Sequence, residues 1–279
     1  MAKYGLPYQG SKSAIAEKII NFLPAGKRFV DLFGGGAAMS DCAAKSGKYE
    51  TVFYNEINPL LCDLVKKAIA GFYNYSVFKP EFISREQFHL LKSIDGYVKY
   101  IWSFGNSGRS YLFSEELESQ KRSLHNFVVF GVKDDFIKTY FDDIEKFVAA
   151  MDIHTRRRQL RRYMRIKMAV RPHQELERLE RLQQLEINCG SYLDYEYQDG
   201  DVVYCDPPYE GTAGYNQTKF NHKQFYDWVA SRPYQVFFSS YKISDKRFKM
   251  IWAKSKQNLM GGAEGQFKNY ECLYTNKDS

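Results

Sequence analysis

Hydrophobic and polar positions along the first part of the chain alternate between two periods. Apolar residues recur at helical spacing over 13–23, and a short apolar run follows over 28–33. Three glycines end this run, and the pattern then predicts a helix over 37–44, a strand over 51–54 and a helix over 58–70. Helices that alternate with strands are typical of a parallel sheet, so the pattern predicts an α/β fold.

The central part of the chain breaks this rhythm, and the C-terminal part resumes it. The segment 102–113 is rich in Gly, Ser and Asn and is flanked by aromatic residues. Leucines at every third position over 174–185 predict a short packed helix. After Gly200 the pattern predicts three strands, over 202–205, 235–240 and 270–275, and a helix over 221–231. One α/β domain with an insert is therefore predicted.

Composition and cysteine spacing narrow the class of protein. With 279 residues, 44% of them hydrophobic and 26% charged, the chain fits a globular protein and excludes a long disordered one. No run reaches the roughly 18 apolar residues of a membrane span, and the N-terminus lacks the apolar stretch of a signal peptide. Five widely spaced cysteines and five histidines without ligand spacing indicate neither disulfides nor a metal site. A cytoplasmic protein is expected.

Basic residues outnumber acidic ones and gather in one segment. The formal net charge is +7, and eight of the sixteen residues from 156 to 171 are basic while none is acidic. Such a run can be a solvated helix face, but phosphates are a natural counter-charge. Contact with DNA is therefore predicted for Arg156, Arg157, Arg158, Arg161 and Arg162. In the loop 105–109, Asn106 and Arg109 could read bases, with an ordinary surface turn as the alternative.

Two features near the N-terminus are compatible with a nucleotide site. The segment Asp31 to Ala37 (DLFGGGA) lies where a strand meets a helix, and its glycines would let a ligand approach the backbone. It fits the dinucleotide fingerprint poorly, and a plain tight turn is the alternative. Glu56 follows about twenty residues later, where an acid can accept hydrogen bonds from ribose hydroxyls; a solvated acid is the alternative.

A tetrapeptide after a predicted strand carries the strongest chemical signal. Asp206-Pro207-Pro208-Tyr209 follows the apolar run that ends at Cys205, and the prolines stiffen the turn. An acid and a backbone carbonyl there can accept the protons of an amine and hold it for reaction. Tyr209 offers a flat face on which a base can stack. The alternative is a proline-rich turn with a helix-capping acid.

These segments together resemble the Dam-like DNA adenine amino-methyltransferases, which carry the same tetrapeptide and use S-adenosylmethionine. Tyr8-Gln-Gly-Ser-Lys12 resembles the first cofactor motif of that family, and the glycine segment, Glu56 and the tetrapeptide follow in the family's order. Ser191 stands where the family often has an acid before an aromatic residue. The resemblance implies that the cofactor is bound by Tyr8, Lys12, Asp31, Phe33, Gly34, Gly35, Gly36, Glu56, Ser191, Tyr192 and Asp206, and that Asp206, Pro207, Pro208 and Tyr209 are catalytic.

The resemblance also implies a fold and a partner. The expected fold is a Rossmann-like S-adenosylmethionine-dependent methyltransferase sheet, with a cofactor-binding part at 1–75, an inserted, mainly helical DNA target-recognition region at 76–172, and the part bearing the tetrapeptide at 173–279. The substrate is expected to be a flipped adenine in double-stranded DNA at specific sites. A cognate restriction endonuclease is the candidate protein partner, and a monomer is favoured. An RNA base-amine methyltransferase and a non-catalytic DNA-binding protein are the alternatives; a dinucleotide oxidoreductase is disfavoured by the glycine spacing.

Overall fold

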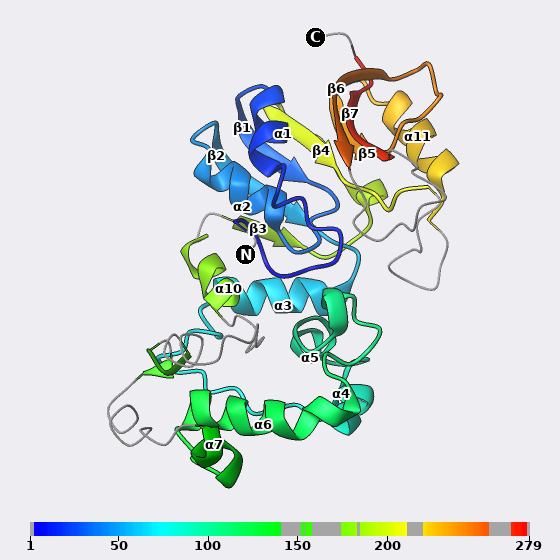
Figure 1. Ribbon diagram of the computed structural model, residues 1–279. Coiled ribbons are helices and arrows are strands. Elements are labelled where there is room, and N and C mark those ends of the chain that lie inside the picture. Colours follow the sequence, from blue (N-terminus) through cyan, green and yellow to red (C-terminus); the bar gives the residue numbers. More distant parts are fainter. Residues whose placement is uncertain are drawn as a thin grey trace. The chain divides into compact units, whose positions relative to one another are not determined.

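The computed structural model (Figure 1) describes residues 3–140, 152–153, 155–157, 174–182, 185–210, 220–256 and 269–277. The chain divides into two compact units, each of which is drawn from separate stretches of sequence. The first unit comprises 1–5, 10–62 and 182–279, and the second comprises 6–9 and 63–181.

The first unit is built on a sheet whose described part has seven strands in the order β3-β2-β1-β4-β5-β7-β6. The strands are β1 (Gly26–Asp31), β2 (Tyr49–Asn55), β3 (Leu185–Asn188), β4 (Asp201–Cys205), β5 (Val236–Ser240), β6 (Lys249–Lys256) and β7 (Asn269–Thr275). Neighbours from β3 to β5 pair in parallel, whereas β7 runs antiparallel to both β5 and β6. Strand order reverses between β1 and β4, and in open α/β sheets ligands bind beyond the strand ends at such a point.

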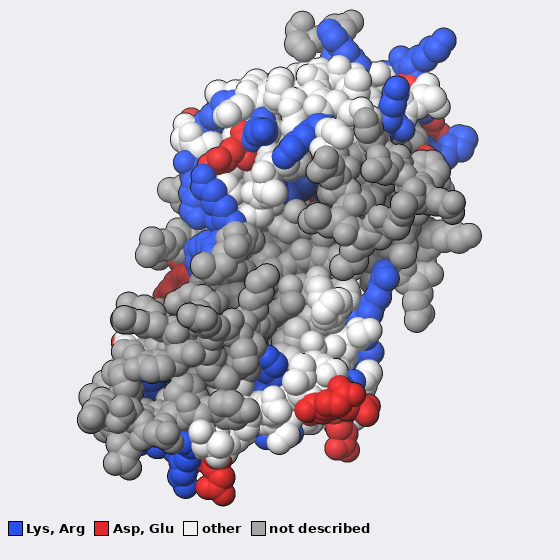
Figure 2. Space-filling model, in the orientation of Figure 1, with Lys and Arg blue, Asp and Glu red and all other residues white. Residues whose placement is uncertain are grey.

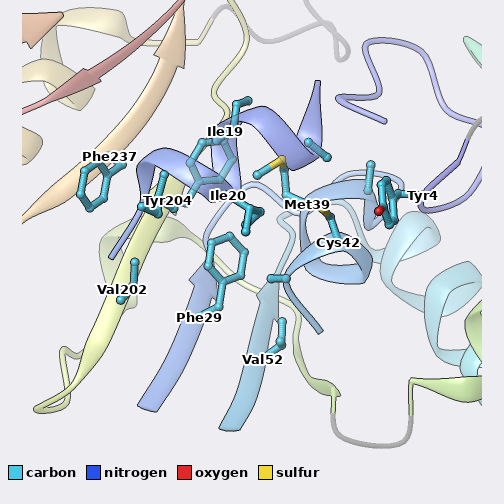
Figure 3. Close-up of a cluster of buried hydrophobic side chains, with 14 of the residues drawn as sticks. Tyr4, Ile19, Ile20, Phe29, Met39, Cys42, Val52, Val202, Tyr204 and Phe237 are labelled. Atoms are coloured by element: carbon cyan, nitrogen blue, oxygen red, sulfur yellow. The ribbon is translucent and has the colours of Figure 1, made fainter. Parts of the chain in front are cut away.

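Helices cover both faces of this sheet. Successive residues of a strand point to opposite faces, so apolar strands present buried side chains on each side. On one face, α1 (Ala16–Phe22) and α2 (Ala38–Lys45) pack against Phe29, Tyr204 and other buried side chains (Figure 3). On the other, α11 (His222–Ala230) packs against Val30, the neighbour of Phe29 in sequence, and against Phe238. Every residue of β4 and β5 is buried, as expected for central strands covered on both faces.

The second unit is helical in its described part. Its elements are most of α3 (Pro59–Ile69), then α4 (Arg85–Leu91), α5 (Gly96–Ile101), the 3-10 turn η1 (Phe104–Asn106), α6 (Glu115–Phe130), α7 (Asp135–Tyr140), α10 (Gln174–Glu177) and the 3-10 turn η2 (Arg178–Arg181). Buried side chains of α6, Leu124, Phe127 and Val128, form a core with Ile137 of α7. The region 76–172, predicted as an insert, falls within this unit.

The predicted α/β class is confirmed, and most of the predicted elements are present with ends shifted by a few residues. The helix predicted over 174–185 is confirmed only in part. The chain instead forms α10 and then η2, and Leu185 begins β3. The leucine spacing explains the difference, because residues three apart align in a 3-10 helix, and Leu176 and Leu179 are fully buried. Strands β3 and β6 were not predicted.

Three further features of the described residues bear on the class of protein. None of their helices is long and apolar enough to cross a membrane. None of their His, Cys, Asp and Glu side chains form a group of three or more that could hold a metal ion. All five cysteines lie in described segments and none forms a disulfide; only Cys189 is exposed.

A buried histidine makes the stability of the second unit sensitive to acid. His125 on α6 is 6% exposed, and its Nε2 lies 2.8 Å from the carbonyl oxygen of Pro80. Because a carbonyl only accepts hydrogen bonds, Nε2 carries a proton in this contact. The rings of Phe82 and Trp102 lie 5.6 and 5.5 Å away. Burial lowers the pKa of His125 to about 4, partly opposed by the hydrogen bond to Pro80.

Acid should therefore destabilise this unit through His125. Below the ordinary histidine pKa of about 6.5 the unfolded chain takes up a proton that the folded chain refuses, so stability is full above that pH and falls toward pH 4. The expected loss is up to about 1.4 kcal/mol per pH unit. His125→Gln keeps a donor for Pro80 but does not titrate, so urea unfolding between pH 8 and 5 should show a shallower slope for the variant. Equal slopes would contradict the assignment.

Candidate active site

Polar side chains gather where the parallel strands of the first unit end. Asp31 is the last residue of β1, Asn55 of β2 and Asn188 of β3, and Asp206 follows β4 directly. Because parallel strands point the same way, these ends share one edge of the sheet.

The buried amide of Asn55 joins three segments at this edge. Its Nδ2 donates to the carbonyls of Leu32 and Gly190 at 3.1 and 3.0 Å, and its Oδ1 accepts from Nδ2 of Asn188 at 2.7 Å. The ends of β1, β2 and β3 are thereby fixed relative to one another. Sequence reasoning missed Asn55; the signal was an amide at the end of an otherwise apolar strand, directly before Glu56.

The glycine segment is shaped by packing against β2. A Cβ on Gly34 would lie 2.2 Å from the ring of Tyr54, so any side chain there would displace that ring. The Tyr54 hydroxyl in turn donates to the carbonyl of Gly35 at 2.8 Å. Gly35 and Ala37 both have positive φ, 51° and 60°, and Ala37 leads into α2. Packing and backbone conformation therefore require glycine at 34 and favour it at 35, besides the ligand approach that the sequence predicts. Gly36 completes the turn.

Glu56 is tied to the glycine segment by backbone amides. Its Oε2 accepts from the amide of Gly35 at 3.0 Å, and its Oε1 accepts from the amide of Asn58 at 2.9 Å. Burial raises the pKa of Glu56, while the two amides lower it by stabilising the charged form. Each carboxylate oxygen keeps a second lone pair, so Glu56 can still accept from a hydroxyl. The solvated acid, the alternative interpretation of the sequence, does not describe this partly buried residue.

Asp31 is almost completely buried at the end of β1. Its Oδ2 accepts a hydrogen bond from the Ser40 hydroxyl on α2 at 2.7 Å. Burial raises the pKa of Asp31 to about 7; the Ser40 hydrogen bond opposes this, and the nearby charges of Asp206 and Glu56 add to it. A carboxyl with a strongly perturbed pKa in a cluster of acids makes this edge a candidate functional site.

Asp206 is paired with Lys12. The Lys12 Nζ lies 2.8 Å from Oδ2 of Asp206, whereas Oδ1 of Asp206 is buried and has no hydrogen-bond partner among the described residues. Burial raises the pKa of Asp206, Lys12 lowers it, and the charge of Glu271 raises it further. Pro207 is buried, and the Pro208 carbonyl accepts from Nε2 of His222 at 2.8 Å, which fixes the turn.

Glu271 on β7 completes this cluster. It accepts a hydrogen bond from the Tyr209 hydroxyl, and its Oε1 lies 3.4 Å from Nζ of Lys12. The same ammonium lies 4.8 Å from the centroid of the Tyr209 ring. Burial and the charges of Asp206 and Glu271 raise the pKa of Tyr209 well above its usual value, so it remains a phenol. Sequence reasoning missed Glu271; its signal was one acid inside an apolar strand.

Ser191 and Tyr192 follow β3 at the same edge. The Ser191 hydroxyl accepts from the amide of Leu193 at 3.2 Å and caps the 3-10 turn η3 (Tyr192–Asp194). The Tyr192 ring is buried against Phe33, 5.1 Å away. The preceding Gly190 amide donates to the carbonyl of Glu56 at 3.2 Å, which ties this segment to the ribose-binding candidate.

Tyr8, Asn106 and Arg109 lie in the second unit. The Tyr8 ring packs edge-on against Tyr100 at 5.4 Å, and Nδ2 of Asn106 donates to the Tyr100 carbonyl at 2.8 Å. Arg109 is exposed, while its backbone carbonyl accepts from Nζ of Lys92 at 3.2 Å. The cofactor contact of Tyr8 and base reading by Asn106 and Arg109 stay predictions.

The described part of the arginine cluster has structural contacts. Arg156 donates from Nε to the Val128 carbonyl at 2.7 Å and from Nη2 to the Val129 carbonyl at 2.9 Å, near the C-terminal end of α6. Arg157 is 6% exposed. Arg158, Arg161 and Arg162 lie outside the described residues. On the face in Figure 2, the described Lys and Arg side chains are spread among acidic ones. Phosphate contact by this cluster stays a prediction.

Comparison with known proteins decides the family. Residues 8–261 match the family described as D12 class N6 adenine-specific DNA methyltransferase. The chain belongs to this family. The retron Ec67 DNA adenine methylase of Escherichia coli is 27% identical over 244 residues, which cover 82% of this chain and 72% of that protein. The DNA N-6-adenine-methyltransferase of Escherichia phage P1 is 25% identical over 217 residues, 73% of this chain but only 23% of the phage protein.

The site geometry is consistent with membership of this adenine methyltransferase family. An acid, two prolines and a tyrosine stand at the end of a central strand, beside the point where strand order reverses. The resemblance inferred from the tetrapeptide and the N-terminal motif is confirmed by the family match.

Proposed function

We propose that this D12-class methyltransferase transfers a methyl group from S-adenosylmethionine to the exocyclic amine of a flipped adenine in double-stranded DNA, at specific sites. The observation that carries the proposal is the position of Asp206. One of its oxygens pairs with Lys12, and the other is buried and accepts no hydrogen bond from the described residues. A buried acceptor of this kind is costly unless a ligand satisfies it, and an amine can do so.

The acids at the sheet edge suit the cofactor. S-Adenosylmethionine carries a sulfonium and an ammonium, and Asp31, Glu56 and Asp206 are three carboxyl groups on neighbouring segments of this edge. Glu56, held by two backbone amides, can accept from ribose hydroxyls. These acids therefore suit a nucleoside that carries positive charge. Phe33, Ser191 and Tyr192, the other residues named for the cofactor in the first unit, lie around the glycine segment.

The chain's own residues are assigned two tasks, to orient the amine of the substrate and to accept the proton that it loses. When bound, the cofactor supplies an electrophilic methyl group on sulfur. The residues of this chain would hold the adenine amine in line with that methyl group, for which the cofactor's sulfur would be the leaving group. Asp206 Oδ1 and the Pro207 carbonyl accept hydrogen bonds from the amine and align it. Asp206, whose pKa burial raises, is placed to take the proton that the amine loses.

The target base needs a surface outside the duplex on which to rest. The Tyr209 ring supplies a flat face, and the Tyr241 ring packs edge-on against it at 4.7 Å and fixes its plane. A base inside a duplex cannot reach a buried acid, so flipping is part of the proposal.

DNA recognition is assigned to the second unit, within which the predicted region 76–172 falls. Its loop 104–109 is braced by Asn106 and by a hydrogen bond from the Gly108 amide to the Ser103 hydroxyl at 2.8 Å. Phe104 on this loop is 64% exposed, and Arg109 is exposed beside it. An exposed aromatic ring and a guanidinium on a braced loop support contact with stacked, charged DNA.

Asp206→Ala should remove methyl transfer because the group that orients the amine is lost. A decrease of about 100- to 1,000-fold or more in the single-turnover rate at saturating cofactor is expected, larger than any loss of cofactor affinity. Transfer of labelled methyl to duplex DNA measures the rate, and calorimetry measures the affinity. Structured RNA serves as the comparison substrate for the wild type. Turnover by the variant equal to that of wild type would contradict the mechanism. If the wild type methylates structured RNA faster than duplex DNA, the proposed substrate is wrong.

Glu56→Gln should weaken binding of S-adenosylmethionine, since a charge-assisted contact with the ribose becomes a neutral one. The expected cost is about 1.5 to 3 kcal/mol, measured by calorimetry. Glu50→Gln is the matched control, because Glu50 is an exposed acid near the other end of β2. Equal affinity in wild type and both variants would mean that the ribose lies elsewhere.

Arg109→Ala should lower affinity for the methylated sequence more than affinity for unrelated duplexes, by roughly 1 to 3 kcal/mol, if Arg109 reads a base. A phosphate contact would instead weaken both duplexes equally and lower the steepness of log affinity against log salt by about 0.9. Titrations of both duplexes at several salt concentrations separate the two cases. No loss on either duplex would exclude Arg109 from the interface.

A further inference from the structure

Glu271 is a buried acid that the mechanism above does not use. It is 4% exposed on β7, a strand that pairs with β5 on one side and β6 on the other, so its backbone position is fixed. Its carboxylate accepts a hydrogen bond from the Tyr209 hydroxyl, and its Oε1 lies 3.4 Å from the ammonium of Lys12. Tyr209 and Lys12 are thereby held by one side chain.

Two largely buried acids share the ammonium of Lys12. One ammonium faces two carboxylates, Asp206 at 2.8 Å and Glu271 at 3.4 Å, and both acids are largely buried. Replacing a buried ion pair by well-packed apolar residues is often neutral or stabilising, so folding alone gives little reason for a second acid. Its contacts with the Tyr209 hydroxyl and the Lys12 ammonium point to the reaction instead.

We propose that Glu271 is a positioning residue for methyl transfer, which keeps the Lys12 ammonium on the Oδ2 side of Asp206 and anchors the hydroxyl end of the Tyr209 ring. This inference rests on the function proposed above. With Lys12 held between two acids, Oδ1 of Asp206 stays open to the amine. Without the charge of Glu271, the Lys12 ammonium is no longer drawn toward β7 and can approach both oxygens of the Asp206 carboxylate.

Glu271→Gln tests this arrangement with little change of shape, since glutamine still accepts from the Tyr209 hydroxyl but does not attract Lys12. The single-turnover methylation rate at saturating cofactor and DNA should fall roughly 10- to 100-fold, the scale of a misplacement by about 1 Å. Affinities for S-adenosylmethionine and duplex DNA should change less than the rate, because Glu271 itself is assigned no contact with either ligand. A purely structural residue would lower the melting temperature without this split.

Asp201→Asn is the matched control. Asp201 is a buried acid at the start of β4 that likewise accepts from a tyrosine hydroxyl, that of Tyr195, and pairs with a cation, Arg28, at 2.8 Å. It stands at the opposite end of the strand that leads to Asp206. This variant should lower the melting temperature while the turnover rate of the folded protein stays at the wild-type value.

Tyr209→Phe tests the second contact, because it removes the hydroxyl that reaches Glu271 and keeps the ring. Its rate should also fall, and this variant decides the question if Glu271→Gln does not fold. Suppose that the wild type is active. If the folded Glu271→Gln variant keeps the wild-type rate, the positioning role alone is overturned. If that variant does not fold, a wild-type rate in Tyr209→Phe overturns it instead. A folded wild type that methylates no adenine in duplex DNA overturns the proposed function and this role together.

Discussion

The ion pair between Lys12 and Asp206 is the interaction on which the candidate active site depends. It joins the N-terminal segment to the end of β4 across a long stretch of sequence, and it lies where water is largely excluded. Ionising a carboxyl group in such a place is unfavourable, as the raised pKa of Asp206 shows, and the ammonium offsets part of that cost. The pair uses only one oxygen of the acid, and under the proposed function the other oxygen accepts from the amine of the substrate.

The sheet brings acids close together, and their negative charges repel one another there. Asp31, Glu56 and Asp206 stand at the ends of different strands, and the parallel arrangement places all three at one edge, where burial and then the charges of Asp206 and Glu56 raise the pKa of Asp31. The fold tolerates this because backbone amides, the Ser40 hydroxyl and Lys12 each stabilise one carboxylate. A cofactor with positive charge would relieve the remaining repulsion, so cofactor binding and stability of the folded first unit should be coupled.

Sequence reasoning proposed those parts of the candidate site that depend on neighbours along the chain. A rigid Asp-Pro-Pro-Tyr turn after an apolar run, or glycines between a strand and a helix, are local patterns with a local physical meaning. Asn55 and Glu271 were missed because their partners are distant in sequence: Asn55 bonds Gly190, and Glu271 meets Lys12. The strand β3 was missed for the same reason, since its short run gains meaning only from pairing with β2.

The glycine segment and the arginines show how one residue type can serve packing and binding together. Gly34 has no room for a side chain because the Tyr54 ring occupies the space, and this would hold whether or not a ligand were bound. Arg156 likewise spends two of its donors on carbonyls near the end of α6, where a cation also interacts favourably with the helix dipole. Removing such a residue alters the scaffold as well as any ligand contact. Exposed Arg109 and isosteric changes at Glu56 and Glu271 are therefore cleaner probes of function than deletions within the glycine segment or at Arg156.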